Sequence, residues 1–200
     1  VLLFALLAGC SPEQEQEENG PGVQDAYYEK SLELGDMLFE DFWLPQAKRM
    51  MAYVPEYISG DIDSDMSGTA SLWAFGAAFT MTGTMLRLDP EYEVLRERAG
   101  MLLEGLEEYR MPRKDRVYSA TVGLSEPYYD DNAWIALGLY DYAEAFGDEA
   151  YYEQARDVTD YVLSGESENG GIFWKESVSS RNTCSCGPAI VAALKEYKHS

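Results

Sequence analysis

Hydrophobic residues recur at helical spacing along most of this chain, and no alternating strand pattern extends beyond a few residues. The pattern predicts an all-α protein with helices over residues 25–44, 68–88, 91–111, 130–146, 149–164 and 182–197. The first, third and fifth of these are amphipathic and carry a charged face. The second, fourth and sixth are apolar on nearly all sides, as in the run AWIALGLY at residues 133–140.

A helix that is apolar on all sides has to be surrounded by protein, so the alternation predicts outer helices paired with enclosed inner ones. Such helical hairpins build a toroid, and six helices are about half of a closed ring of about twelve. We therefore expect a part of a larger ring, truncated after residue 200, with apolar surface exposed along its open edge.

The connections between the helices differ in length. Those that follow the inner helices are tight, whereas those that lead into inner helices are long, about twenty residues. Long connections often carry function. We therefore expect a functional site at the amino-terminal ends of the inner helices.

The start of the chain indicates export. Val1 to Cys10 form an apolar run that is too short to span a bilayer. The run ends in Leu-Ala-Gly-Cys, which is typical of a bacterial lipobox. This predicts a cleaved signal peptide over residues 1–10, a lipid on Cys10, and a lipoprotein tethered at the cell surface or in the periplasm. Residues 11–24 are rich in Glu, Gln, Pro and Gly and are predicted to be a disordered acidic tether before the domain of residues 25–200.

Composition narrows the possible functions. With 46% hydrophobic residues the chain can bury a core. Its 36 acidic and 15 basic residues give a net charge of −21, which repels nucleic acid and anionic lipid and favours a neutral partner. The one histidine, His199, argues against a catalytic triad or a histidine-ligated metal. Carboxylates are left as the candidate catalytic groups.

Two adjacent carboxylates, Asp130 and Asp131, stand at the start of the fourth predicted helix within the run YYDDNAW. Glycosidic bond cleavage uses one carboxylate as a nucleophile and a second carboxyl as a proton donor. A helix start favours an ionised carboxylate, and that charge raises the pKa of its neighbour. Successive helical positions can place the two groups at the separation of about 5 Å found in retaining enzymes. In the alternative interpretation, both residues only cap the helix.

Other candidates are weaker. The glycines of Gly170–Trp174 precede an aromatic pair that can form a sugar platform, although Trp174 and Trp73 equally suit a core. Asp61, Asp63 and Asp65 faintly resemble a calcium loop, but Met66 and Leu72 stand where Gly and Glu are needed, and we expect no metal.

The two cysteines near the end of the chain, Cys184 and Cys186, lack the further ligands of a zinc site. We expect them to be free, buried thiols, with a strained disulfide as the alternative.

Several motifs together resemble glycoside hydrolase family 76, the endo-acting α-1,6-mannanases. The resemblance covers the chain from Gly68 to the end, and its motifs are LWAFGAAFTMTG at 72–83, YYDDNAWIALGLYDYA at 128–143, FGD at 146–148, GGIFW at 170–174 and RNTCSCGPAIVAALKEY at 181–197.

This resemblance implies an (α/α)6 barrel, of which about the first half is present, and retaining hydrolysis of α-1,6-linked mannan without a metal or other cofactor. It implies that Asp130 is the nucleophile and Asp131 the general acid/base. Together with the aromatic residues named above, it gives an expected substrate-binding set of Trp73, Tyr128, Tyr129, Asn132, Trp134, Trp174 and Asn182. Cys186 departs from the family pattern, where relatives often carry Asn, so a polar contact there is in question.

Three other functions fit parts of this pattern. A non-catalytic glycan-binding surface lipoprotein would use the aromatic residues but not the paired acids. An unsaturated glycuronyl hydrolase has a similar toroid, but its anionic substrate would be repelled by so acidic a chain. A sugar epimerase needs histidines as acid and base, and this chain has one.

Overall fold

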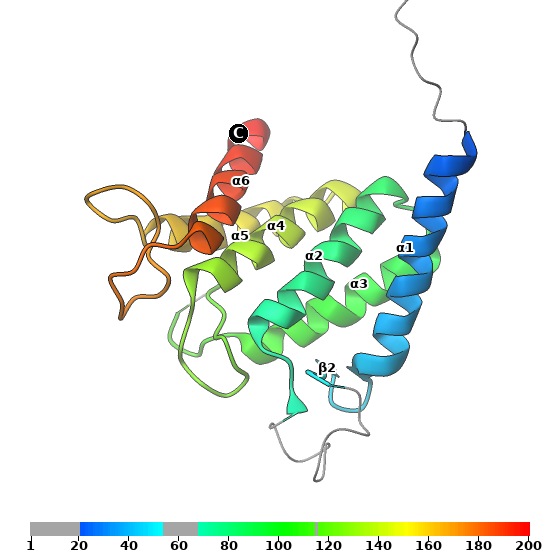
Figure 1. The fold of residues 1–200 in the computed structure, drawn as a ribbon, viewed down its shortest axis with the longest axis horizontal. Helices are drawn as coiled ribbons and strands as arrows, with labels where there is room; N and C mark the ends of the chain where they lie inside the picture. Colours follow the sequence, from blue (N-terminus) through cyan, green and yellow to red (C-terminus); the bar gives the residue numbers. More distant parts are fainter. Residues whose placement is uncertain (1–20, 54–67, 115) are drawn as a thin grey trace, which may run out of the picture. The chain divides into compact units, whose positions relative to one another are not determined.

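The computed structural model describes residues 21–53, 68–114 and 116–200. Its elements in order are α1 (Pro21–Phe42), β1 (Trp43–Leu44), β2 (Arg49–Met50), α2 (Leu72–Leu88), α3 (Glu93–Leu106), the short 3₁₀ helix η3 (Glu107–Tyr109), α4 (Tyr129–Phe146), α5 (Glu149–Leu163) and α6 (Thr183–His199) (Figure 1). None of the helices within these ranges is long and apolar enough to cross a membrane.

Two of the sequence predictions fall elsewhere in the chain. Cys10 and the residues Asp61, Asp63 and Asp65 lie outside the described residues. The lipidation of Cys10 and the expectation of no metal at the three aspartates therefore stay predictions. The helix that follows the predicted tether begins at Pro21, four residues before the expected boundary at residue 25.

The chain divides within α1 into two units, one up to Asp36 and one from Met37 to Ser200. In the first unit, Lys30 forms an ion pair with Glu33, one helical turn further on. The second unit contains all the remaining elements, and the site described below belongs to it. Its two-residue strands β1 and β2 pair antiparallel, with Trp43 opposite Met50.

Each helix predicted from the pattern is present, and local contacts set its ends. α2 begins at Leu72 because Ser71 caps it, its hydroxyl accepting the N–H of Ala74 at 3.4 Å. The residues before it are extended, and Thr69 forms a bridge with Met51. α4 ends at Gly147, whose left-handed backbone closes the helix as glycine does without strain.

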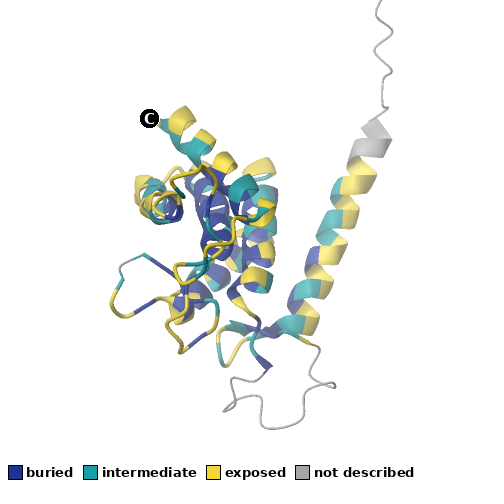
Figure 2. Cartoon of the chain, turned by 60° about the vertical axis from the view of Figure 1, so that its left-hand side comes forward, coloured by how far each residue is buried: buried dark blue, intermediate teal, exposed yellow. Residues whose placement is uncertain are grey.

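The inner position of α4 explains its apolar sequence. It packs against α2, α5 and α6, and every residue from Tyr129 to Ala143 except Trp134 is buried. Figure 2 shows these buried positions in dark blue at the centre of this unit. α2 approaches α4 so closely that a Cβ atom on Gly138 would lie 2.4 Å from the Phe79 ring. Glycine is therefore required at this helix crossing.

The sixth helix carries exposed apolar surface of the kind that was expected along an open edge. α6 packs against α4 and α5 on one side, but its opposite side is not enclosed by described residues. The exposed apolar side chains there include Ile190 (60% exposed), Leu194 (59%) and Tyr197 (80%). An all-round apolar helix thus has an open apolar edge in this structure, which is the kind of surface that another element covers.

A buried carboxylate connects the three inner helices near their carboxyl-terminal ends. Asp141 on α4 accepts a hydrogen bond from the Thr84 hydroxyl on α2 at 2.8 Å. Its other oxygen pairs with Lys195 on α6 at 2.5 Å, and Arg87 lies 3.3 Å away. Because each partner compensates the buried charge, we refer to these four residues as the basal clamp.

Candidate active site

The amino-terminal ends of all three inner helices meet at one pocket of about 570 Å³. The lining residues are Ser71 and Trp73 from α2 and its cap, Tyr128, Asp130 and Asp131 from the start of α4, Asn182 and Cys184 from the start of α6, and Ala120, Thr121, Glu126 and Trp174 from the connections. A pocket therefore lies where the linker lengths predicted a functional site, and its function stays a prediction. We call this space the acid pocket.

The aspartate pair lies in the first turn of α4, and each side chain is 6% exposed. The capping position is Tyr128, which makes no side-chain cap hydrogen bond. Neither aspartate therefore occupies the capping position, which removes the interpretation of the pair as helix caps. The carboxylates instead face a pocket at the positive end of the helix dipole.

Burial and the neighbouring charge separate the properties of the two acids. Burial, followed by the charge of Asp130, raises the pKa of Asp131 from 3.8 to about 7. Asp131 therefore holds a proton below neutral pH, as a general acid must.

One oxygen of Asp130 is held by a specific donor. The indole N–H of Trp174 donates to Oδ2 of Asp130 at 3.1 Å. The other oxygen, Oδ1, is buried and has no hydrogen-bond partner among the described residues. A buried acceptor without a donor is costly, and such exceptions to satisfied hydrogen bonding are found at functional sites. In Asp130, Oδ2 thus accepts the indole N–H, whereas Oδ1 has no hydrogen-bond partner among the described residues.

Trp174 belongs to an extended turn over residues 164–181, which we call the hairpin loop. Its backbone is tied to the start of α4, because the Tyr129 N–H donates to the Trp174 carbonyl at 3.0 Å. Gly170 and Gly171 have φ of +77° and +80°, conformations that other residues rarely adopt. The Arg181 guanidinium closes the turn by donating to the Gly170 carbonyl at 2.8 Å.

Cys186 on α6 provides a further anchor for the hairpin loop. Its sulfur accepts the backbone N–H of Ile172 at 3.3 Å. At this position, where the chain departs from the family pattern, a sulfur acceptor thus makes a polar contact. Both Cys184 and Cys186 are free thiols, as expected, but Cys184 is exposed in the acid pocket rather than buried.

The rim of the pocket is aromatic, and the lysine beside it forms an ion pair. Trp73 is 61% exposed on the α2 side, and the Tyr128 ring packs edge-on against Trp174 at 4.9 Å on the other side. Lys175 pairs with Glu126 and donates to the Tyr128 hydroxyl at 3.1 Å. Among the described residues, no lysine, arginine or histidine lines the pocket itself.

The structure corrects two members of the predicted substrate-binding set. Tyr129 is 5% exposed and stacks on Tyr161 at 5.0 Å, so it belongs to the core beneath the hairpin loop. Asn132 is fully buried, and its side-chain amide exchanges hydrogen bonds of 2.9 Å with the backbone N–H and carbonyl of Tyr118. It also donates to the Tyr128 carbonyl at 2.8 Å. These two residues support the walls of the site and are not among the residues that line the acid pocket.

The remaining members are divided as follows. Trp134 is half-buried, does not line the acid pocket, and accepts the Thr80 hydroxyl on its carbonyl at 2.9 Å. Trp73, Tyr128, Trp174 and Asn182 are brought together around the two aspartates.

Sequence reasoning did not assign Cys184 or Glu126 to the site. The position of Cys184 two residues after Asn182, at the start of an inner helix, was the available signal. Burial, followed by contact with the Asp130 carboxylate, raises the pKa of the Cys184 thiol, so it stays protonated. No group of three or more acidic, histidine or cysteine side chains within the described ranges is arranged to hold a metal.

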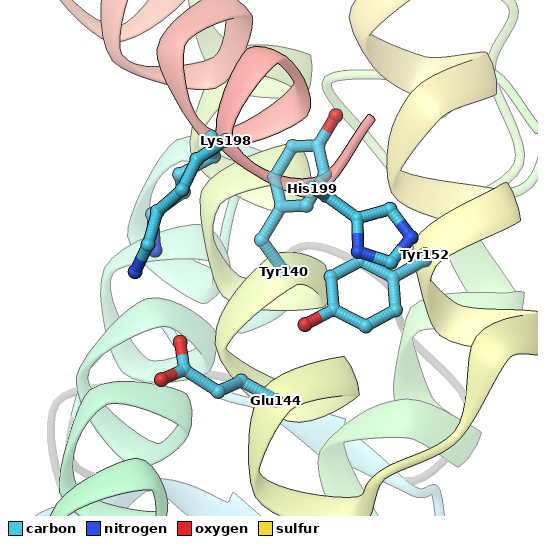
Figure 3. Close-up of a pocket in the computed structure, with 6 residues that line it drawn as sticks. Tyr140, Glu144, Tyr152, Lys198 and His199 are labelled. Atoms are coloured by element: carbon cyan, nitrogen blue, oxygen red, sulfur yellow. The ribbon is translucent and has the colours of Figure 1, made fainter.

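A second pocket lies at the other end of α4, lined by Tyr140, Glu144, Tyr152, Lys195, Lys198 and His199 (Figure 3). The His199 ring stacks on Tyr152 at 3.6 Å and bonds Glu149 at 3.1 Å. This pocket contains no adjacent acid pair, so the acid pocket is the better candidate for catalysis.

The inner helices of this all-helical fold present two adjacent carboxyl groups to a pocket with an aromatic rim, which is an arrangement found in glycoside hydrolases. Comparison with known proteins gives the same class. The sequence profile of Glycosyl hydrolase family 76 matches residues 45–200. The chain belongs to this family.

Three solved structures share the fold. A family 76 mannosidase from Bacteroides thetaiotaomicron superposes with a TM-score of 0.74 at 22% identity, covering 88% of this chain and 49% of that one. An α-1,6-mannanase of Salegentibacter sp., an inactive variant with two neighbouring aspartates changed to asparagine and in complex with α-1,6-mannotriose, gives 0.63 at 18% identity, covering 87% and 46%. The unsaturated glucuronyl hydrolase of Bacillus sp. GL1 gives 0.64 at 14% identity, covering 88% and 50%. The chain thus has an (α/α)6-type fold and spans about half the length of these proteins.

Proposed function

We propose that the protein containing this chain hydrolyses α-1,6-mannosidic bonds in mannan with retention of configuration. Asp130 is the nucleophile and Asp131 the general acid/base. The observation that carries the proposal is the contrast within the pair: Asp131 has a pKa of about 7, while Asp130 is held by the Trp174 indole N–H in the first turn of α4.

In the first step, the Asp130 carboxylate attacks the anomeric carbon while Asp131 gives its proton to the departing glycosidic oxygen. The bond from the anomeric carbon to that oxygen breaks, and a glycosyl ester forms on Asp130. In the second step, Asp131 takes a proton from water, which displaces Asp130 and releases the sugar. Each group then returns to its starting state.

The charge of the pocket supports a neutral substrate. The lining contains three acidic residues, Glu126, Asp130 and Asp131, and among the described residues no cation. The nearest lysine, Lys175, is already paired with Glu126. A uronic acid carboxylate would find no counter-charge here, so this lining favours mannose units over the unsaturated glycuronyl alternative.

The aromatic rim supports sugar binding. The indole rings of Trp73, from α2, and Trp174, from the hairpin loop, both line the pocket, with Tyr128 packed against Trp174. Aromatic faces pack against the apolar C–H surfaces of sugars, and Asn182 adds an amide for hydroxyl groups. The α-1,6 specificity rests on the family and on the mannotriose complex of the Salegentibacter relative.

The test is Asp130→Asn in the full-length protein. We expect release of reducing sugar from α-1,6-linked mannan to fall at least about a thousandfold, because the variant lacks the nucleophile while keeping its shape. Binding of α-1,6-mannotriose, measured by calorimetry, should stay within about threefold, because both indole rings remain. Retained hydrolysis would refute the assignment of Asp130. A wild-type protein that binds the trisaccharide and releases nothing would instead support the glycan-binding alternative.

A further inference from the structure

We infer that Trp174 is a positioning residue for Asp130, and that the hairpin loop holds the Trp174 indole N–H against the carboxylate of this nucleophile. This inference rests on the proposed role of Asp130. It differs from a sugar platform, because the contact that counts is made by the edge of the ring to the protein and not by its face to the substrate.

The hydrogen bond itself is the first argument. The Trp174 N–H donates to Oδ2 of Asp130 at 3.1 Å, and the Cys184 thiol is the other group in contact with this carboxylate. A donor to a charged acceptor fixes the direction of that acceptor. Removing the indole N–H would take the defined donor from Oδ2 of a nearly buried carboxylate whose Oδ1 already has no hydrogen-bond partner among the described residues.

The second argument is that the backbone of Trp174 is fixed on both sides. Its carbonyl accepts the Tyr129 N–H and its own N–H donates to the Ser180 carbonyl, both at 3.0 Å. Tyr129 immediately precedes Asp130, so donor and acceptor are held by the same backbone pair. The edge-on contact with Tyr128 sets the ring plane. The two backbone hydrogen bonds and the ring contact fix the direction of the Trp174 indole N–H. A ring that only stacks on a sugar would not need its N–H direction to be fixed.

The third argument is the support of the hairpin loop. Cys186 and Arg181 hold its turn through the Ile172 N–H and the Gly170 carbonyl. A Cβ atom on Gly165 would lie 2.7 Å from the Tyr129 ring, so the loop is seated directly on the helix that bears the acids. The loop is therefore coupled to the start of α4 along its length.

The surroundings of Asp130 show what the loss of this bond would change. The titratable and charged groups around it are Asp131 on the same helix, Cys184 at the start of α6, and, at the rim, Glu126, Tyr128 and Lys175. Lys175 is paired with Glu126, and the Cys184 thiol contacts the Asp130 carboxylate. The Trp174 N–H is the contact that fixes the direction of Oδ2, so its removal should lower kcat and leave KM nearly unchanged.

The experiment is Trp174→Phe in the full-length protein, assayed on α-1,6-linked mannan between pH 4 and 9. We expect kcat to fall about ten- to a hundredfold with KM within about twofold. A second variant carries 3-benzothienylalanine at position 174, which keeps the bicyclic shape and replaces the N–H by sulfur. It should show the same fall in kcat and keep the wild-type melting temperature.

The matched control is Trp73→Phe, the exposed indole that lines the pocket from α2, for which KM should rise while kcat stays near the wild-type value. Our inference is overturned if the position-174 variants raise KM and leave kcat unchanged, since that is the behaviour of a sugar platform. Wild-type protein without activity on mannan, or an active Asp130→Asn variant, would instead refute the proposed function and is measured first.

Discussion

The raised pKa of Asp131 makes a prediction about stability that does not depend on any substrate. A carboxyl group with a pKa of 3.8 in the unfolded chain and about 7 in the folded protein binds its proton more tightly when folded. Between these values the folded state carries the extra proton, so stability falls as pH rises through that window. Above pH 7 the full cost is present, and the two pKa values give about 4 kcal/mol.

Asp131→Asn removes this cost, because the amide stays neutral at every pH. At pH 4.5, where Asp131 is protonated in the fold and only partly so in the unfolded chain, the full-length variant should be more stable than the wild type by only about 1 kcal/mol. It should be more stable by about 3 to 4 kcal/mol at pH 8.5. Urea unfolding at several pH values, followed by tryptophan fluorescence, measures the difference.

The control is Asp160→Asn, which removes the same charge from an exposed position on α5. The difference in free energy of unfolding between Asp160→Asn and the wild type should not rise between pH 4.5 and 8.5 as it does for Asp131→Asn. If the gain for Asp131→Asn is the same at pH 4.5 and 8.5, or absent at both, then burial does not hold a proton on this group and the acid/base assignment loses its basis.

Two further predictions follow from the same site. Because Asp131 must be protonated to donate, kcat/KM on α-1,6-linked mannan should fall about tenfold per pH unit above pH 7, and a profile that stays flat to pH 9 would contradict this role. Asn132→Ala should lower the free energy of unfolding by about 2 to 4 kcal/mol, because it leaves the buried N–H and carbonyl of Tyr118 unpaired. At temperatures well below melting, KM for mannan should stay near the wild-type value, whereas a direct sugar contact by Asn132 would raise it.

Helical periodicity was sufficient to predict the fold class and the helix positions. The strongest signal was the alternation of charged and all-apolar helices, and the enclosed α4 agrees with it at nearly every residue. The apolar pattern of α6 reports what the helix is suited to contact, and the half-ring that the pattern implied predicted exposed apolar side chains such as Ile190 and Leu194. A helix can therefore be apolar on a side that no described residue covers.

The site was predicted less completely, for a reason that Asn132 and Tyr129 illustrate. Both stand beside the acids in sequence, but successive helical positions point about 100° apart, so neighbours of a catalytic residue often face the core. Trp174 shows the reverse: it lies 44 positions from Asp130 and contacts it directly. Its role depends on how a loop folds back, and such long-range contacts leave no local signal.

The basal clamp has a consequence for how the mouth of this site can change. Asp141 fixes α2, α4 and α6 to one another at the end remote from the acids, through Thr84 and Lys195. The connections at the mouth other than the hairpin loop are thereby relieved of aligning these helices. Their sequences are open to insertion and replacement, so new glycan preferences can be acquired while the two carboxyl groups keep their register.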